Sequence, residues 1–454
     1  MRMFTPRRVA SAIAATLLFL SAAARADEPR RFTLAECLER AQRQSPLVAA
    51  AGARVAFARA QQTEARYAPF FDLRMGAQGG VIPRVRDANG NETFSTDLTR
   101  LSVDSLGSLS PVVRFSLEYR LPIYTFGKIS SARDAAGANV RVQEWDQEKA
   151  RLQVRAEVRK AYFGAQAARD GEYLLREARR SLDRTIASIS EKLDRGEPGV
   201  DEGDRLRLEF VADDLDNRVG DLEKKESEAL AALRFLTGTQ SAFELVDAPL
   251  SRPSQPLRPV VEYLTAARLY RPEVNMARAG VAARQAQLAG ARARLLPDFA
   301  MLGAGSYWGA PALAKEKNVV QDSVVFGLGM QWTLDFLPGW ARLDQAAAQV
   351  EEVLSQARLA LGGVAVEVET QYAAVVEAMK REEVTARAEK RAKSWYVTVQ
   401  DAVELGTKDE RASVEPLRYH LSARAEHIRA LFDLYVATTE LARVSGWDAA
   451  APSG

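Results

Sequence analysis

The residues that most often carry chemistry in proteins are scarce in this sequence. Among 454 residues there is one cysteine, Cys37, and there are two histidines, His420 and His427. The histidines stand seven residues apart, wider than the four-residue interval of a chelating pair on a helix. A single cysteine forms no intramolecular disulfide, and no serine–histidine–aspartate or cysteine–histidine arrangement is evident. We therefore predict no enzyme activity, no cofactor and no metal site.

The charge balance and hydropathy narrow the class of protein. Lysine and arginine number 62 and aspartate and glutamate 60, so the formal net charge is only +2. Nucleic-acid binders usually carry a basic excess, so no nucleic-acid partner is predicted. A mean hydropathy of −0.22 excludes a membrane protein of many helical spans, but it is compatible with amphipathic β-strands. The composition favours either a soluble helical protein or a membrane protein built from such strands.

Residues 1–26 have the pattern of a cleaved secretory signal peptide. Arginines at positions 2, 7 and 8 precede an apolar run over residues 9–24, and Ala24-Arg25-Ala26 forms an A-x-A cleavage site. The run is shorter than the ~20 residues that a transmembrane helix needs. Removing the four arginines of this segment leaves 58 basic and 60 acidic residues, a net charge of −2. Cys37 lies well beyond the cleavage site, so the chain is not expected to be lipidated on an N-terminal cysteine.

Stretches without proline predict two very long helices. Residues 128–195 and 340–405 are rich in alanine, glutamate, arginine, glutamine and leucine, which are strong helix formers. The first would be roughly 100 Å long at 1.5 Å per residue. Gly196 and Gly406 follow these stretches as C-terminal signals. Globular helices seldom exceed about 25 residues, so both need lateral partners along their whole length.

Four shorter helices can supply those partners, and we predict them at 34–66, 204–236, 260–295 and 415–444. Two of them end to end match one long helix, so we expect stacked short pairs beside each long helix in coiled-coil contact. Residues suited to close packing recur along the second long helix: Ala346, Val350, Val353, Ala357 and Leu361.

The chain also repeats itself. Ser45-Pro46 recurs as Arg271-Pro272 after 226 residues, and Gly196 recurs as Gly406 after 210. Each half has the pattern of a short helix, a strand pair, a long helix, a reversal and a second short helix. We predict a signal peptide at 1–26, a first repeat at 27–247, a linker at 248–259, a second repeat at 260–446 and a short tail at 447–454.

Two segments alternate strictly between apolar and polar residues, at 113–123 and 324–334, and weaker alternation begins near residues 71 and 299. Segments of this length suit strands that cross a bilayer, which need about 9 to 11 residues. A water-soluble sheet with one buried face is the alternative, but no further strand or helix face is evident to cover it. The candidate lipid-facing residues are Phe115, Leu117, Tyr119, Leu121, Phe326, Leu328, Met330 and Trp332.

The four predicted strands cannot close a barrel alone. An open sheet edge in hydrocarbon leaves unpaired backbone groups, which cost several kcal/mol each. The chain must therefore oligomerise if these strands lie in a membrane, and two, three or four copies would give about 8, 12 or 16 strands. Side chains fill an eight-stranded barrel, so a conduit favours three or more copies. The arithmetic alone leaves the number open.

Aromatic residues also gather near the predicted strands. They fit either a girdle at the membrane interface or packing within a core, and their depth cannot be read from the sequence. They are Tyr119, Tyr124, Trp308, Trp332 and Trp340.

Several motifs resemble those of the TolC-type outer-membrane efflux channels. They are Phe32-Thr33-Leu34-Ala35-Glu36-Cys37-Leu38 followed by Ser45-Pro46, then Pro122-Ile123-Tyr124-Thr125-Phe126-Gly127, and Ala231-Ala232-Leu233-Arg234-Phe235-Leu236-Thr237-Gly238. The resemblance spans nearly the whole mature chain, and the order of the elements that carry these motifs occurs twice. The resemblance implies a mainly α protein with transmembrane β: a duplicated long-helix coiled-coil protomer whose homotrimer forms a 12-stranded barrel and a 12-helix tunnel.

The same resemblance implies a location and partners. The barrel would lie in the outer membrane and the tunnel would cross the periplasm. A periplasmic adaptor (membrane-fusion) protein and an inner-membrane pump would engage the tunnel and drive export of small molecules or polypeptides. The channel itself would be a passive exit duct of a tripartite efflux or type I secretion system. The sequence does not identify the cargo or the class of pump.

In that family the closed end lies where the long helices reverse. Here acidic residues stand eight or nine positions after each glycine, and Pro416 replaces a valine of the family pattern. A trimer would turn each acidic residue into a ring of three like charges, which favours cations; a solvated helix start is the alternative. The candidate gate residues are Asp201, Glu202, Asp204, Lys408, Asp409, Glu410, Arg411, Glu415 and Arg418, and the candidate adaptor-docking tips are Gly196, Gly406, Leu206 and Leu417.

A periplasmic coiled-coil adaptor or scaffold protein is the competing hypothesis. Such a protein would also combine a signal peptide with long antiparallel helices. It would have one helical hairpin and soluble β domains, however, rather than a duplicated strand pair. The four alternating segments therefore favour the channel.

Overall fold

The computed structural model describes residues 30–70, 72–86, 92–94, 109–196, 201–241, 243–246, 248–309, 320–408 and 410–447. Contacts within the chain divide the protein into two compact units. Unit 1 comprises Met1–Ala49, Ala150–Leu264 and Glu367–Gly454, and unit 2 comprises Ala50–Lys149 and Thr265–Val366. The predicted signal peptide and nearly all of the predicted tail lie outside the described residues.

The helices follow one pattern twice. α2 (Leu34–Gln44) and α3 (Pro46–Tyr67) have 11 and 22 residues, and α6 (Val260–Tyr270) and α7 (Pro272–Arg294) have 11 and 23. The long helices α4 (Lys128–Asp194) and α8 (Phe336–Glu404) have 67 and 69 residues. α5 (Glu202–Thr237) and α9 (Val414–Ser445) follow with 36 and 32. The order and lengths of the helices thus repeat, as the sequence predicts.

Two helices predicted as continuous are broken, which corrects the sequence-based boundaries. The stretch 34–66 divides at Ser45 and the stretch 260–295 divides at Arg271, where ψ is 129° and 125°. A proline follows each break, and its ring disfavours the helical conformation in the preceding residue. α8 also begins four residues earlier than predicted, at Phe336. Pro338 is tolerated there because N–H groups in a first turn have no intrahelical partner.

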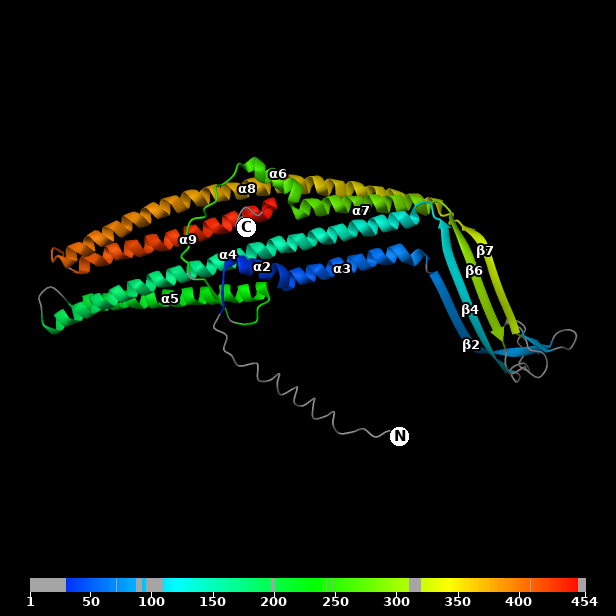
Figure 1. Cartoon of the computed structure of the whole chain (residues 1–454), viewed down its shortest axis with the longest axis horizontal. Helices are drawn as coiled ribbons and strands as arrows, with labels where there is room; N and C mark the ends of the chain where they lie inside the picture. The colour runs from blue at the N-terminus through cyan, green and yellow to red at the C-terminus, as the bar shows by residue number, and fades with distance from the viewer. Residues whose placement is uncertain are drawn as a thin grey trace, which may run out of the picture. The chain divides into compact units, whose positions relative to one another are not determined.

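A five-stranded antiparallel sheet in the order β3-β2-β4-β6-β7 lies within unit 2 (Figure 1). Its long strands are β2 (Asp72–Arg86), β4 (Leu109–Tyr124), β6 (Asp298–Gly309) and β7 (Val320–Gln331), and the short β3 (Glu92–Phe94) pairs with the end of β2. β7 ends where Gln331 pairs with Asp298. The preceding residue, Pro297, has no N–H to continue the ladder. Trp332, predicted to be a strand residue, therefore lies one residue beyond β7.

The helices of unit 2 follow the same order as its strands. Arg54 of α3 binds Asp146 of α4 at 3.0 Å, and Arg284 of α7 donates to Gln349 of α8 at 3.1 Å. A Cβ added to Gly290 of α7 would lie 2.9 Å from the hydroxyl oxygen of Ser131 in α4. The layer therefore runs α3-α4-α7-α8, with α3 and α8 at its two edges.

Unit 1 has a compact core where α2, α4 and α5 meet a two-stranded sheet that the sequence pattern did not predict. β1 (Arg30–Phe32) pairs in parallel with β5 (Phe243–Leu245). The core buries Phe32, Cys37, Val158, Leu233 and Leu236 among others, so the first and third family motifs meet in one cluster. Burial raises the pKa of the Cys37 thiol to about 11.

Candidate functional site

Strand register brings the apolar residues of the sheet onto one face. Tyr119 of β4 faces Gly303 of β6, and Gly303 faces Phe326 of β7. Because side chains alternate between the two faces of a strand, this register places seven of the predicted lipid-facing residues on the same face. They are Phe115, Leu117, Tyr119, Leu121, Phe326, Leu328 and Met330. We call this surface the apolar face.

The apolar face is exposed in a single chain. Phe326, Leu328 and Met330 on β7 are 77%, 82% and 62% exposed, and Phe115 and Leu117 on β4 are also exposed. Tyr119 and Leu121 are half-buried. Soluble monomers rarely expose a contiguous apolar surface of this extent. The face therefore needs a non-aqueous neighbour.

The opposite face of the sheet is mainly polar. Register pairs Asp72 with Arg120 and Arg74 with Glu118, so opposite charges lie across β2 and β4. The hydroxyls of Ser306 and Ser323 lie 2.7 Å apart across β6 and β7. A sheet with one apolar and one polar face has the pattern of a membrane barrel wall, whose outside contacts lipid and whose inside contacts water.

The two outer strands have open edges. In the part of the chain that the structure describes, β7 pairs with β6 alone, and β2 pairs with β4 alone from Asp72 to Pro83. Their outward N–H and C=O groups are available to another strand. In a membrane such edges must be paired.

The helical reversals of unit 1 hold the candidate gate residues. Asp201 and Asp204 form a capping box at the start of α5: the Asp204 N–H donates to Asp201 Oδ1 at 2.8 Å, and the Asp201 N–H donates to Asp204 Oδ2 at 3.4 Å. Arg205 binds Glu202, and this hydrogen bond lowers the pKa of the Glu202 carboxyl. These three acids therefore already have contacts within one chain.

The second reversal packs beside the first. Val414 and Leu421 of α9 contact the cluster formed by α4 and α5, which includes Ile189 and Leu208. Glu415 and Arg418 are exposed on the first turns of α9, as is Lys408 before it. Glu410 and Arg411 lie in the short 3-10 helix η6 (Glu410–Ser413), and Asp409 lies outside the described residues.

The predicted docking tips include both helix-ending glycines. Gly196 and Gly406 have φ values of 66° and 69°, the left-handed conformation that ends a helix. Leu206 is 54% exposed, whereas Leu417 is half-buried. Sequence reasoning missed Phe210, which is 75% exposed one turn beyond Leu206. Its spacing of four residues from Leu206 was the available signal.

Each histidine has its own surroundings in unit 1. His427 of α9 lies between two carboxylates of α8: Nδ1 contacts Glu389, and Nε2 lies 3.5 Å from Glu382. His420 stacks on Tyr396, and burial lowers its pKa. The described residues contain no group of His, Cys, Asp or Glu that could hold a metal ion.

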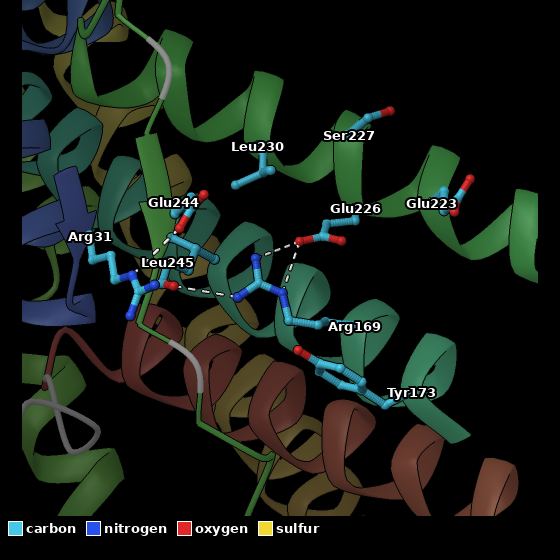
Figure 2. A pocket seen from close by; sticks show the side chains of 9 residues that line it. All are labelled: Arg31, Arg169, Tyr173, Glu223, Glu226, Ser227, Leu230, Glu244 and Leu245. Atoms are coloured by element: carbon cyan, nitrogen blue, oxygen red, sulfur yellow. Dashed lines mark hydrogen bonds and ion pairs between the residues drawn. The ribbon is translucent and has the colours of Figure 1, made fainter. Parts of the chain in front are cut away.

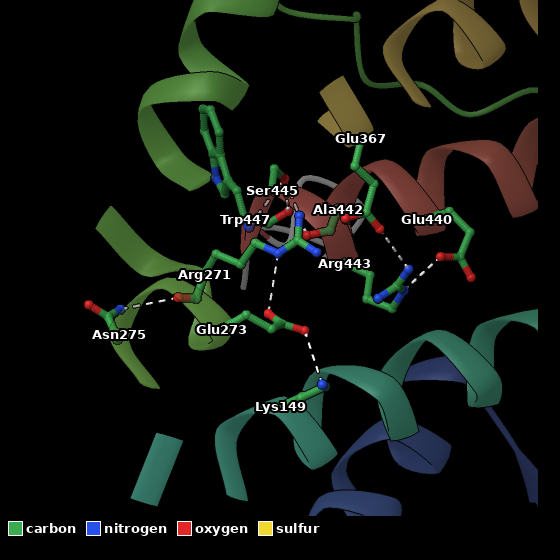
Figure 3. A network of polar contacts seen from close by, with 10 residues as sticks. All are labelled: Lys149, Arg271, Glu273, Asn275, Glu367, Glu440, Ala442, Arg443, Ser445 and Trp447. Atoms are coloured by element: carbon green, nitrogen blue, oxygen red, sulfur yellow. Dashed lines mark hydrogen bonds and ion pairs between the residues drawn. The ribbon is translucent and has the colours of Figure 1, made fainter. Parts of the chain in front are cut away.

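Two further polar clusters are structural in character. In unit 2, Glu273 contacts Arg271 at 3.2 Å and Lys149 at 3.5 Å; burial opposes ionisation of its carboxyl, but these contacts and a backbone hydrogen bond leave its pKa lowered (Figure 3). In unit 1, Arg443 bridges Glu440 at 2.7 Å and Glu367 at 3.6 Å. Both clusters join neighbouring helices and leave no reactive group in place.

One recess of about 480 Å³ lies in unit 1, where β1 and β5 meet α4 and α5 (Figure 2). Arg169 crosses it, donating to Glu226 at 2.6 and 3.0 Å and to the Leu245 carbonyl at 3.4 Å. Arg31 lies 3.5 Å from Glu244 at its rim. The charges are matched within the chain, so the recess strengthens the junction and presents no catalytic arrangement.

Comparison with known proteins agrees with this geometry. The sequence profile described as outer membrane efflux protein matches residues 37–239 and 264–447. The fold is similar to the Neisseria gonorrhoeae MtrE outer membrane channel in its open state, with a TM-score of 0.72 and 17% identity over 91% of this chain and 89% of that one. It is also similar to the Campylobacter jejuni CmeC outer membrane channel, with a TM-score of 0.70 and 16% identity over 93% and 90%.

The outer-membrane channel OprN has a TM-score of 0.70 and 18% identity over 92% of this chain and 91% of its own. A search of the curated proteins finds no match. At these identities the similar structures establish the fold alone. The profile match covers most of the chain.

Proposed function

As this chain belongs to the outer membrane efflux protein family, we propose that it is the exit duct of a tripartite efflux or type I secretion system. The observation that carries the proposal is the four-strand register, which forms an exposed apolar face on one side and a mainly polar face on the other. The duct is passive, and an inner-membrane pump and a periplasmic adaptor drive export through it. No catalytic step belongs to this function.

The open sheet edges support a homotrimer. β7 of one copy pairs with β2 of the next, so three copies close a 12-stranded barrel in the outer membrane. Because α3 leads into β2 and α8 follows β7, the same ring brings the edge helices of neighbouring copies together.

Among the described helices, α8 carries an 18-residue stretch that is apolar enough by composition to cross a membrane, and only 17% of it is buried in one chain. Contact with a neighbouring copy in the periplasmic tunnel would cover it.

The closed end of the tunnel is proposed to lie at the two reversals of unit 1. The capping box of α5 already engages Asp201 and Asp204, and Arg205 already binds Glu202. The stronger gate candidates are therefore Glu415, Arg418 and Lys408. Leu206 and Phe210 offer the exposed apolar surface that an adaptor can cover.

Fractionation and conductance test the proposal together. The mature chain should be recovered from outer membranes as an oligomer that resists detergent but dissociates on heating, and it should conduct ions in planar bilayers. Replacing the exposed apolar tip residues, Leu206→Ser together with Phe210→Ser, should leave the oligomer intact but abolish export. Recovery in the soluble periplasmic fraction, without a heat-sensitive oligomer, would favour a periplasmic adaptor or scaffold protein instead.

A further inference from the structure

The polar face of the sheet, opposite the apolar face, is arranged in rows of residues that lie side by side across the strands. In one row Asp72 of β2 lies opposite Arg120 of β4. In the next row Arg74 lies opposite Glu118, and Arg74 also forms an ion pair with Asp72 at 3.1 Å. The residues that continue these two rows on β6 and β7 carry no charge. Each row therefore holds one cation and one anion and is neutral as a whole.

The row through Arg114 has a different composition. Arg114 of β4 lies opposite Gln78 of β2 and Trp308 of β6, and Trp308 lies opposite Gln321 of β7. This row therefore contains a cation and no carboxylate. The Arg114 side chain is exposed in a single chain. Across the polar-face rows that the four long strands share, the charges sum to +1, and Arg114 is the unmatched charge.

A row of hydroxyl groups, which we call the serine row, lies between Arg114 and the neutral rows. Ser116 of β4 lies opposite Ser306 of β6, and Ser306 lies opposite Ser323 of β7. The hydroxyls of Ser306 and Ser323 are 2.7 Å apart, and a Cβ added to Gly76 of β2 would lie 2.7 Å from the hydroxyl oxygen of Ser116. Two residues at about 3.3 Å each separate the serine row from Arg114 along β4. Hydroxyl groups can donate hydrogen bonds to an anion, so this row adds donors beside the cation.

We propose that Arg114 forms an anion-binding ring in the lumen of the barrel, beside the serine row, and that the cargo it favours is a small organic anion such as a carboxylate or a phosphate ester. The ring rests on the proposed function, because the threefold symmetry of the trimer places three Arg114 side chains at one height. Rings of arginine or lysine favour anions in pores because the cations attract the ion within a narrow space. The guanidinium group also suits carboxylates and phosphates because it presents two parallel N–H donors.

Reversal potentials in planar bilayers test the ring. The oligomer of the full mature chain is compared with its Arg114→Gln and Arg114→Glu variants under a gradient of KCl, and in a second series under a gradient of potassium butyrate. Arg114→Gln should lower the ratio of anion to potassium permeability roughly two- to fivefold at about 0.1 M salt, and Arg114→Glu should lower it further. At about 1 M salt, where the Debye length is about 3 Å, most of the difference should disappear.

A double substitution on the same face supplies the matched control. Arg74→Gln combined with Glu118→Gln removes two opposite charges that lie across β2 and β4, so it leaves the net charge of the polar face unchanged. Its permeability ratio should stay at the native value. The candidate gate residues are the same in every variant, so their contribution cancels in the comparison.

These measurements separate the ring from the proposed function. A native chain that forms neither an oligomer nor a conducting pore refutes the exit duct, and the ring falls with it. A conducting native pore whose permeability ratio is unchanged by Arg114→Gln refutes the ring alone. An equal fall in the control double variant also overturns the ring, because the unmatched cation would then not set the preference. An effect of Arg114→Gln on chloride but not on butyrate would overturn the assignment to organic anions.

Thiol reactivity gives a second measurement if the Arg114 variants do not assemble. Ser116→Cys places a thiol beside Arg114 in the otherwise native chain, while Cys37 is fully buried and should not react. Relative to their rates with a free thiol, an anionic methanethiosulfonate reagent should modify Ser116→Cys several-fold faster than a cationic one. Val325→Cys lies in the neutral row through Glu118 and should show a smaller preference. Equal rates of the two reagents at Ser116→Cys would refute the ring.

Discussion

A charge placed on either side of one strand should distinguish the two faces of the sheet. Phe326 and Val325 are adjacent on β7, both are apolar, and they are 77% and 62% exposed. Register places Phe326 on the apolar face opposite Gly303, and Val325 on the other face opposite Ala304. Residue type and exposure are therefore similar, and only the face differs.

The expected magnitude follows from the depth of the position. Phe326 lies near the middle of a 12-residue strand, and if the apolar face contacts lipid, as proposed, an arginine at this depth costs about 2–4 kcal/mol. That is roughly a 30- to 1,000-fold decrease in the folding equilibrium constant per chain. In the proposed barrel, Val325→Arg would point into water beside a small neighbour, so its effect should stay within about 0.5 kcal/mol.

Urea unfolding of the bilayer-reconstituted protein measures both variants, with the free energy of unfolding obtained by linear extrapolation. Phe326→Ala is the control for loss of the ring, which packs over Gly303. The difference between Phe326→Arg and Phe326→Ala isolates the charge. Equal losses for Phe326→Arg and Val325→Arg would refute the assignment of faces, and a larger loss for Val325→Arg would reverse it.

Three further outcomes are expected from unit 1. Gly238→Ala should destabilise the protein by about 1–2 kcal/mol or more in thermal or urea unfolding, because φ is 65° and a Cβ would lie 2.7 Å from the Gln44 carbonyl oxygen. Gly220 has open space around it, so the control variant Gly220→Ala should not destabilise the protein. Equal effects of the two substitutions would contradict the reasoning. Cys37, with a pKa of about 11 and no exposed surface, should resist maleimide labelling at pH 8 until the chain is unfolded, and rapid labelling of the native protein would disprove its burial. Burial lowers the pKa of His420 below its unfolded value, so the stability that the neutral ring contributes should be fully present above about pH 6.5 and should be lost as the pH falls below it. His420→Gln should therefore weaken the fall of Tm at low pH. An unchanged profile in this variant would assign the pH dependence to other groups.

Long periodic elements could be predicted from the sequence because each carries many residues of signal. The proline-free stretches placed both ends of α4 within about one residue, and the alternation in β4 and β7 identified residues that share one face by register. The three-residue strands β1 and β5 were missed because so short a segment has no measurable period. Their pairing depends on chain segments more than 200 residues apart.

The candidate gate shows a different limit of sequence reasoning. Charge and position drew attention to Asp201 and Asp204, but the same two residues satisfy the free N–H groups at the start of α5. Acidic residues three apart before a helix are themselves a capping signal, so the local explanation was readable in advance. The exposed start of α8 was missed for the opposite reason: Pro338 suggests a non-helical approach to the helix, whereas proline is in fact compatible with a first turn.

The near-equal helix lengths of the two repeats restrict how this chain can change in length. A residue removed from α4 rotates every later side chain by about 100° about the helix axis, which turns buried positions outward. Removing seven or eleven residues restores the angular phase to within about 20°. Because α4 and α8 differ by only two residues, a viable deletion must also be made in both repeats and in the short helices beside them. Related channels of different tunnel length should therefore differ by paired insertions in steps of about seven or eleven residues, while their loops vary freely.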